Sequence, residues 1–90
     1  MIKWSVSPEV LSSMIDDEVV LMSIKEGYYF SLEPVGSRIW NLLSEHPATV
    51  EELIYRLMIE YDIDRDTCLK DVQVFIDEMT SKNLILKLEE

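Results

Sequence analysis

The sequence predicts an α+β fold in which a three-stranded antiparallel sheet at the N-terminus is followed by three helices and a final strand over residues 84–88. Two observations lead to this prediction. The first 32 residues contain short runs of alternating, β-branched and aromatic side chains, which are typical of strands. Residues 34–81 then carry apolar side chains at helical spacing, interrupted by Pro and Asp. Strands and helices that are segregated along the chain are typical of α+β domains.

The first two strand signals are of unequal strength. Residues 2–6 alternate apolar and polar side chains, as a half-buried strand does, and Pro8 ends this run. Residues 9–17 have a mixed pattern that contains two adjacent serines and two adjacent aspartates. We therefore expect a turn-rich connection there, with at most a short strand around residues 13–15.

Residues 19–32 form the clearest hairpin pattern of the chain. Two β-rich runs, residues 19–24 and 28–32, are joined by the turn Lys-Glu-Gly. Alternation along each strand then divides its side chains between two faces. The residues expected on the core face are Val20, Met22, Ile24, Tyr28, Phe30 and Leu32.

The second strand of this hairpin is expected to leave one edge unpaired. Residues 28–32 are followed by Pro34, and no later segment obviously pairs with their outer side. An unpaired edge can receive an extended peptide as an added strand. Edges are also commonly just solvated or protected by charges, a role open to Lys25 and Glu26. Both interpretations stand on the residues alone.

Three helices are predicted from their start signals. The first follows Pro34 and covers residues 35–45, because proline suits the first turn of a helix. Thr49 and Glu52 form a capping-box pattern that opens the second helix. Asp64 is a natural N-cap for the third, which extends to about residue 81. Helices of this number and length resemble a winged helix-turn-helix.

Length and composition predict one small domain, residues 1–90. With 48% hydrophobic residues, two Gly and three Pro, the chain has the composition of a globular protein. Cys68 is the single cysteine, which fits a reducing compartment, so we expect a cytoplasmic protein. No apolar run approaches the roughly 20 residues of a membrane span, and the N-terminus has no secretion-signal pattern. We expect no membrane partner.

The residues that carry out catalysis or bind metals in other proteins are scarce. The chain has one His and one Cys, and it has no glycine-rich phosphate loop. His46 lies beside Pro47 between two helices, and Cys68 is expected to be a small buried residue. Residues 62–66 resemble the start of a calcium loop, but the glycine and the glutamate that complete such a loop are missing. We expect no catalytic residue, no metal site and no cofactor.

The charge of the chain bears on its partners. Eighteen acidic and eight basic residues give a net charge of −10, which repels nucleic acid and anionic lipid. The third helix carries only Arg65, Lys70 and Lys82 as cations, so nucleic acid is not expected as a partner. A small winged-helix DNA-binding regulator is the alternative from another class. The acidic surface either attracts a basic or mixed-charge peptide or serves solubility alone.

Two adjacent segments carry a resemblance to a known family. Residues 20–32, VLMSIKEGYYFSL, and residues 35–43, VGSRIWNLL, resemble the PqqD-like family. The segments TVEEL at 49–53 and YDID at 61–64, with Asp71, Val72 and Phe75, extend the match to about residues 9–86. The resemblance implies a winged helix-turn-helix with an N-terminal three-stranded sheet. It also implies a non-catalytic recognition element for the leaders of ribosomally made, modified peptides, most similar to the free-standing form of lasso-peptide biosynthesis.

The resemblance also implies a ligand and its contacts. The leader of a precursor peptide pairs with the strand at 28–32 and is delivered to a leader peptidase; a carrier for a radical-SAM enzyme is the alternative within the family. We expect a monomer or a weak homodimer. The alternative to a binding role for Phe75 is a place wholly in the core, and for Asp71 and Glu78 it is a merely solvated position. Trp40 is expected in the core. The implied peptide-binding residues are Tyr28, Tyr29, Phe30, Ser31, Leu32, Asp71, Val74, Phe75 and Glu78.

Overall fold

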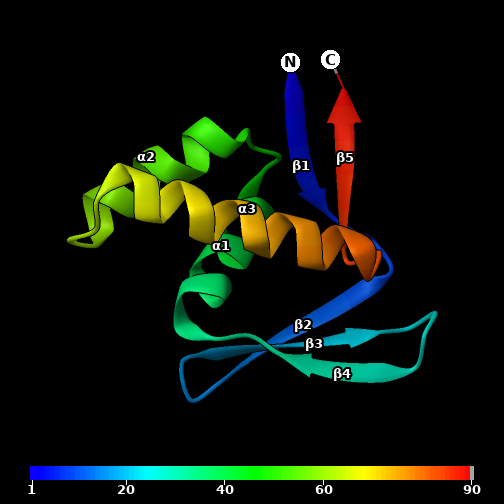
Figure 1. The fold of residues 1–90 in the computed structure, drawn as a ribbon. Helices are drawn as coiled ribbons and strands as arrows, with labels where there is room; N and C mark the ends of the chain where they lie inside the picture. The colour runs from blue at the N-terminus through cyan, green and yellow to red at the C-terminus, as the bar shows by residue number, and fades with distance from the viewer. Residues whose placement is uncertain (90) are drawn as a thin grey trace.

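The strands form two sheets and the helices pack against them (Figure 1). The computed structural model describes residues 1–89, so the last residue of the predicted domain lies outside the described part. The α+β class is confirmed, but the predicted arrangement of strands is corrected below. In chain order the elements are β1 (Ile2–Val6), β2 (Val10–Ile15), β3 (Glu18–Ser23), β4 (Tyr28–Ser31), α1 (Pro34–Glu45), α2 (Val50–Glu60), α3 (Arg65–Ser81) and β5 (Ile85–Glu89).

The first predicted strand does not belong to the three-stranded sheet. β1 pairs antiparallel with β5, from Ile2 opposite Glu89 to Val6 opposite Ile85. Trp4 also exchanges two backbone hydrogen bonds with Ala48, of 2.8 and 3.0 Å, which joins this ribbon to the α1–α2 connection. Figure 1 shows β1 and β5 side by side, extending away from the other sheet. Alternation along the sequence marked β1 as a strand, but it did not specify the partner strand.

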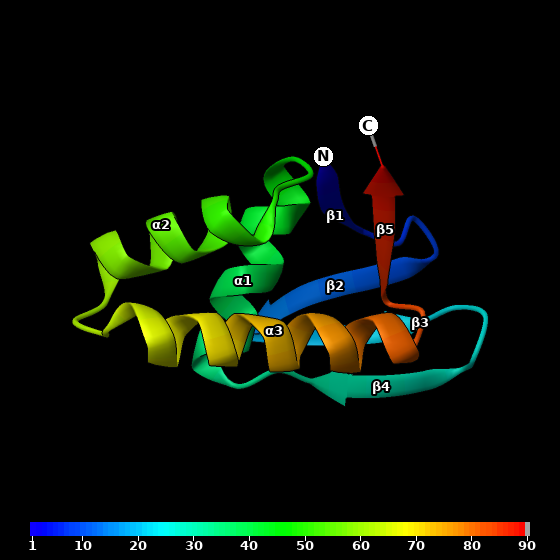
Figure 2. The ribbon, with the colours of Figure 1, turned by 45° about the horizontal axis from the view of Figure 1, so that its top comes forward.

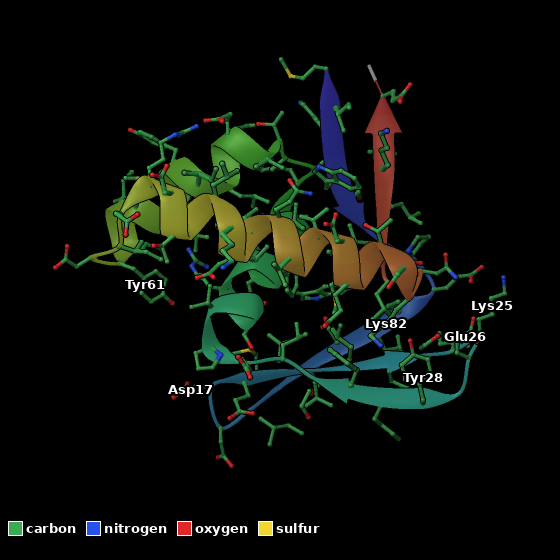
Figure 3. The ribbon with its side chains drawn as sticks, in the orientation of Figure 1. Asp17, Lys25, Glu26, Tyr28, Tyr61 and Lys82 are labelled. Carbon is green, nitrogen blue, oxygen red and sulfur yellow. The ribbon has the colours of Figure 1, made fainter. Side chains whose placement is uncertain are left out.

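The three-stranded sheet is instead β2-β3-β4, and β2 occupies the segment expected to be a turn-rich connection. Its pairing with β3 ends at Ile15 opposite Glu18, so only Asp16 and Asp17 form the turn. Both have positive φ, 51° and 67°, as a two-residue type I′ hairpin turn requires. Figure 3 shows Asp17 at this turn, and Lys25 and Glu26 at the other end of the sheet. Asp-Asp is a weaker turn signal than Asn-Gly, and for this reason the sequence indicates a strand shorter than the observed β2.

The predicted core face was right for β4 and wrong for β3. Leu21 pairs with Phe30, and Val19 and Leu21 are fully buried, whereas Ile24 is 58% exposed. The turn between β3 and β4 comprises residues 24–27, one residue more than expected, and Gly27 takes positive φ in it. A shift of one residue in register moves every side chain of a strand to the opposite face.

The helices begin and end close to their predicted bounds, and the core lies between them and the three-stranded sheet. Pro34 opens α1, the Thr49–Glu52 capping box opens α2, and the Asp64 carboxylate accepts the Thr67 N–H at the start of α3. Trp40 is 1% exposed, which confirms its place in the core, and Cys68 is buried as expected. The other fully buried side chains include Val19, Leu21, Ile39, Leu43, Leu53, Ile54, Leu57, Val72, Ile76, Met79, Leu84 and Ile85.

Candidate functional site

β4 is an edge strand of the β2-β3-β4 sheet, and within residues 1–89 no other strand pairs with its outer side. The Leu32 N–H, one residue past β4, donates to the Val19 carbonyl over 2.9 Å. Along an antiparallel strand the backbone groups of successive residues point to opposite edges, so residues two apart point to the same edge. The N–H and C=O of Phe30 therefore point toward β3, whereas those of Tyr29 and Ser31 point toward the open edge.

A groove of about 460 Å³ lies between β4, the first turns of α1 and the outer face of α3. Figure 2 shows α3 lying along β4, with α1 behind them. The groove therefore follows the same direction as the open strand edge. Its walls consist of Phe30, Ser31, Leu32, Glu33, Val35, Gly36, Ile39, Lys70, Asp71, Val74, Phe75 and Glu78.

The α3 wall of the groove follows from the spacing of its side chains. Asp71, Val74, Phe75 and Glu78 stand three, four and seven residues apart, so they share one face of the helix. Val72, Ile76 and Met79, which the structure buries completely, hold the other face of α3 in the core. Packing in the core thus fixes the position of the helix, and the side chains on its opposite face line the groove.

The groove combines an apolar base with a mostly acidic rim. Leu32 and Ile39 are buried beneath it, Phe75 is half-buried, and Val74 is 58% exposed. Glu33, Asp71 and Glu78 stand on the rim with Lys70, and none of the four takes part in an ion pair with another described residue. Three carboxylates against one ammonium group favour a ligand with a positive charge next to an apolar side chain.

Ser37 joins the strand edge to α1. Its hydroxyl accepts the Val19 N–H at 3.0 Å and donates to the Leu32 carbonyl over 3.2 Å. The side chain is almost completely buried, at 3% exposed. The hydroxyl therefore sits at the junction of β3, the end of β4 and the helix, where it satisfies two buried backbone groups. This bridge holds β4 in position beside the groove.

Lys82, at the C-terminal end of α3, packs its ammonium group against β4. The Lys82 ammonium lies 5.2 Å from the centroid of the Phe30 ring, within the range of a cation–π contact. Figure 3 shows the Lys82 side chain reaching from the end of α3 toward β4. This contact adds a second link between the helix wall and the strand, on the side away from α1.

The structure brings together seven of the nine residues singled out from the sequence. Phe30, Ser31, Leu32, Asp71, Val74, Phe75 and Glu78 line the groove. Tyr28 and Tyr29 do not: Tyr28 lies opposite Ser23 beside the hairpin turn, and Tyr29 is 72% exposed on the outer face of the sheet. Tyr29 reaches the open edge through its backbone alone.

Five further groove residues were not expected: Glu33, Val35, Gly36, Ile39 and Lys70. Four of them belong to the β4–α1 connection and the first turns of α1, whose approach to α3 is a tertiary feature. One signal was available in the sequence. Lys70 precedes Asp71 and lies four residues before Val74, so helical periodicity alone places it near the same face.

Among residues 1–89 no group of three or more His, Cys, Asp or Glu side chains is arranged to hold a metal ion. Within the same range, none of the helices has the length and apolar character needed to cross a membrane.

The fold and the groove define a small α+β domain with an open sheet edge beside a helix-lined groove. The family described as Coenzyme PQQ synthesis protein D (PqqD) matches residues 18–85, and the chain belongs to this family. This finding confirms the resemblance read from the sequence. The comparison with curated proteins gave no match.

Two solved structures are similar to this chain. One, described as TbiB1 in complex with the TbiA(β) leader peptide, is 42% identical and has a TM-score of 0.84; the match covers 90% of this chain and 93% of that one. The other, described as lasso peptide synthetase B1 complexed with the leader peptide, has a TM-score of 0.80 and covers 92% of this chain and 96% of that one. At 20% identity the second similarity concerns the fold alone.

Proposed function

We propose that this protein is a non-catalytic adaptor that binds the leader segment of a ribosomally synthesised precursor peptide and presents it to a processing enzyme. In this proposal residues 1–90 act as one peptide-binding domain. The observation that carries it is the open edge of β4 directly beside the groove. The 42% identity to a protein described in complex with a leader peptide supports the choice of ligand.

The leader binds by β-strand addition to β4. The outward N–H and C=O groups of Tyr29 and Ser31 pair with its backbone, and this supplies affinity that does not depend on the leader's sequence. Because side chains alternate along a strand, every second side chain of the leader points into the groove. The groove then supplies the specificity that backbone pairing lacks.

The groove residues divide the recognition between them. Val74 and Phe75 hold an apolar side chain of the leader against the base of the groove. Asp71 and Glu78 bind a lysine, an arginine or a hydroxyl group on either side of it, since the rim is acidic and these carboxylates have no ion-pair partner among the described residues.

The enzyme served is a leader peptidase of lasso-peptide biosynthesis. The adaptor acts mainly by raising effective concentration, because a tethered substrate meets the enzyme at roughly millimolar levels when linkers are short and flexible. A carrier for a radical-SAM enzyme is the second candidate, and the family description that matches residues 18–85 favours it. The genes next to the coding sequence distinguish the two: a short precursor gene with a protease gene supports the first.

Other partners fit the charges less well. We propose that the protein works in the cytoplasm, as a monomer or weak homodimer, without nucleic acid, membrane, metal or cofactor. We keep the winged helix-turn-helix as our description of α2, α3 and the β1–β5 ribbon. In such a fold DNA would bind at α3. Arg65, a cation of that helix, is bound to Glu51 at 2.6 Å, and the net charge of the chain is −10. A mobility shift with duplex DNA at low salt would contradict this part of the proposal.

The test is a titration of labelled leader onto the purified protein. The peptide is the leader encoded by the precursor gene beside this one, with the TbiA(β) leader as a reference and a scrambled leader as the negative control. We expect saturable binding with Kd of about 1 μM or tighter, equivalent to about 8 kcal/mol. The proposal is overturned if the neighbouring leader shows no saturable binding at tens of micromolar.

Proline substitutions test the strand-addition step. Tyr29→Pro removes an outward N–H and should weaken binding about five- to tenfold, whereas Tyr29→Ala keeps this donor and should change binding little. The matched control is Ser12→Pro on β2, the opposite edge strand. The Ile24 N–H donates to the Glu9 carbonyl, so by alternation the N–H of Ser12 also points outward. Equal losses from Tyr29→Pro and Ser12→Pro would contradict leader pairing at β4.

Truncation of the groove wall tests the pocket by a different route. Phe75→Ala should weaken leader binding by about tenfold or more through loss of the apolar surface. Leu69→Ala is the control, because Leu69 is a comparably apolar α3 residue, 39% exposed, that does not line the groove. If Phe75→Ala stays folded and binds as tightly as the wild type, the leader does not use this groove.

A further inference from the structure

Gly36 lies in the first turn of α1, and its backbone conformation does not require glycine. Of the two glycines, only Gly27 has positive φ, so the conformation of Gly36 is open to other residues. Glycine inside a helix is unfavourable relative to alanine, because it has more conformational freedom to lose. The reason for glycine at this position must therefore be the space around it.

That space is occupied by the Phe75 ring. A Cβ added at Gly36 would lie 3.0 Å from Phe75 Cε1 and 3.2 Å from Cδ1, and 3.9 Å from Leu32 Cβ. Contacts as short as the first two are tighter than most Cβ atoms make, so the ring would have to give way by a few tenths of an ångström. By contrast, a Cβ at Gly27 would meet nothing within 4 Å. The Phe75 ring thus rests directly on the α1 backbone, in the position where a side chain would otherwise be.

The ring has one direction in which to move. Val72, Ile76 and Met79 are completely buried, so the core fixes the α3 backbone around Phe75 and the helix cannot easily shift away. The ring is half-buried, and its exposed part lines the groove. A side chain at position 36 would therefore turn the ring into the groove, where solvent leaves room.

We infer that Gly36 is a positioning residue that sets the depth of the groove. By leaving room for the Phe75 ring against α1, it keeps the space between α3 and β4 open for a bulky apolar side chain of the leader. With a methyl group at position 36, the displaced ring narrows that space and the groove holds a bulky side chain less well. This inference rests on the proposed function, because it assigns Gly36 to the same ligand.

The experiment is a double-mutant cycle of Gly36→Ala, Phe75→Leu and the double variant, with two readouts. Gly36→Ala should weaken leader binding about tenfold, and Gly36→Ser should do the same because it adds the same Cβ. In the Phe75→Leu background, Gly36→Ala should change binding less than twofold, since the shorter side chain leaves the contact. Asn41→Ala, elsewhere on α1, is the control for changes in helix propensity and should bind as the wild type does.

The second readout needs no ligand. In the wild type, NMR should show nuclear Overhauser contacts between the Phe75 ring protons and the Gly36 Hα protons, and Gly36→Ala should shift the ring resonances. If the wild type binds no leader, the proposed function fails. If the wild type binds leader but Gly36→Ala binds equally well, or is as harmful in Phe75→Leu as alone, the inference about Gly36 fails and the proposed function stands.

Discussion

Replacing Ser37 by alanine tests how the strand edge is held. In the structure the Ser37 hydroxyl accepts the Val19 N–H at 3.0 Å and donates to the Leu32 carbonyl over 3.2 Å. The substitution removes both bonds together and leaves a buried N–H and a buried C=O without these partners. It removes no apolar contact, because alanine keeps the Cβ. The change in stability therefore reports the polar bridge.

The expected cost can be estimated from these two groups. A buried polar group left without a partner costs about 1–3 kcal/mol, so two groups at the low end cost about 2 kcal/mol. Alanine is the better helix former by roughly 0.5 kcal/mol, which offsets part of this. We expect a net loss of about 1.5–2 kcal/mol, or roughly 6–16 °C in Tm for a domain of this size.

The assay is urea unfolding followed by circular dichroism and by tryptophan fluorescence, to which the buried Trp40 and the half-buried Trp4 both contribute. Ser44→Ala is the matched control: Ser44 is an exposed serine of the same helix, whose hydroxyl donates to the Trp40 carbonyl over 2.9 Å. It should cost less than about 0.5 kcal/mol, because the carbonyl it serves lies in its own helix. A loss for Ser37→Ala no larger than that of Ser44→Ala would refute the bridge and indicate that Val19 and Leu32 pair directly.

Three further predictions concern the helices. Thr49→Ala removes the side-chain acceptor of the α2 capping box and should cost about 1 kcal/mol of unfolding free energy in urea; an unchanged midpoint would contradict it. The hydrogen bond from Arg38 lowers the pKa of Glu60, and the Thr49 N–H lowers the pKa of Glu52. Both carboxyls therefore contribute stability above their unfolded pKa, about 4.3, that is lost as the pH falls through their lower folded pKa values. Unfolding measured from pH 7 to pH 3 should show this acid loss, and Arg38→Met should reduce it. Burial raises the pKa of the Cys68 thiol, so iodoacetamide should label it at neutral pH only in urea; rapid labelling of the folded protein would contradict its burial.

The helices were predictable because their signals are local. Pro34, the Thr49–Glu52 box and Asp64 act within one turn of the chain, and the structure places helix starts at all three. The face of α3 that lines the groove was also predictable, because its spacing of three and four residues does not depend on a partner. The face of β3 was not, since Val19 to Met22 are all apolar and one extra turn residue decided the register.

By itself, the sequence determined the α+β class, the helix bounds, the strand with an open edge and the family. These depend on local propensity, capping and residue identity. Only the tertiary structure decided that β1 pairs with β5, that Val19 and Leu21 form the buried face of β3, and that α1 brings Glu33, Val35 and Gly36 to the groove wall. The physical reason is that partner choice, register and close approach depend on groups far apart in the chain. Gly36 is a clear case: a Cβ added there would lie 3.0 Å from the Phe75 ring, and this close approach exists only after α1 and α3 have packed.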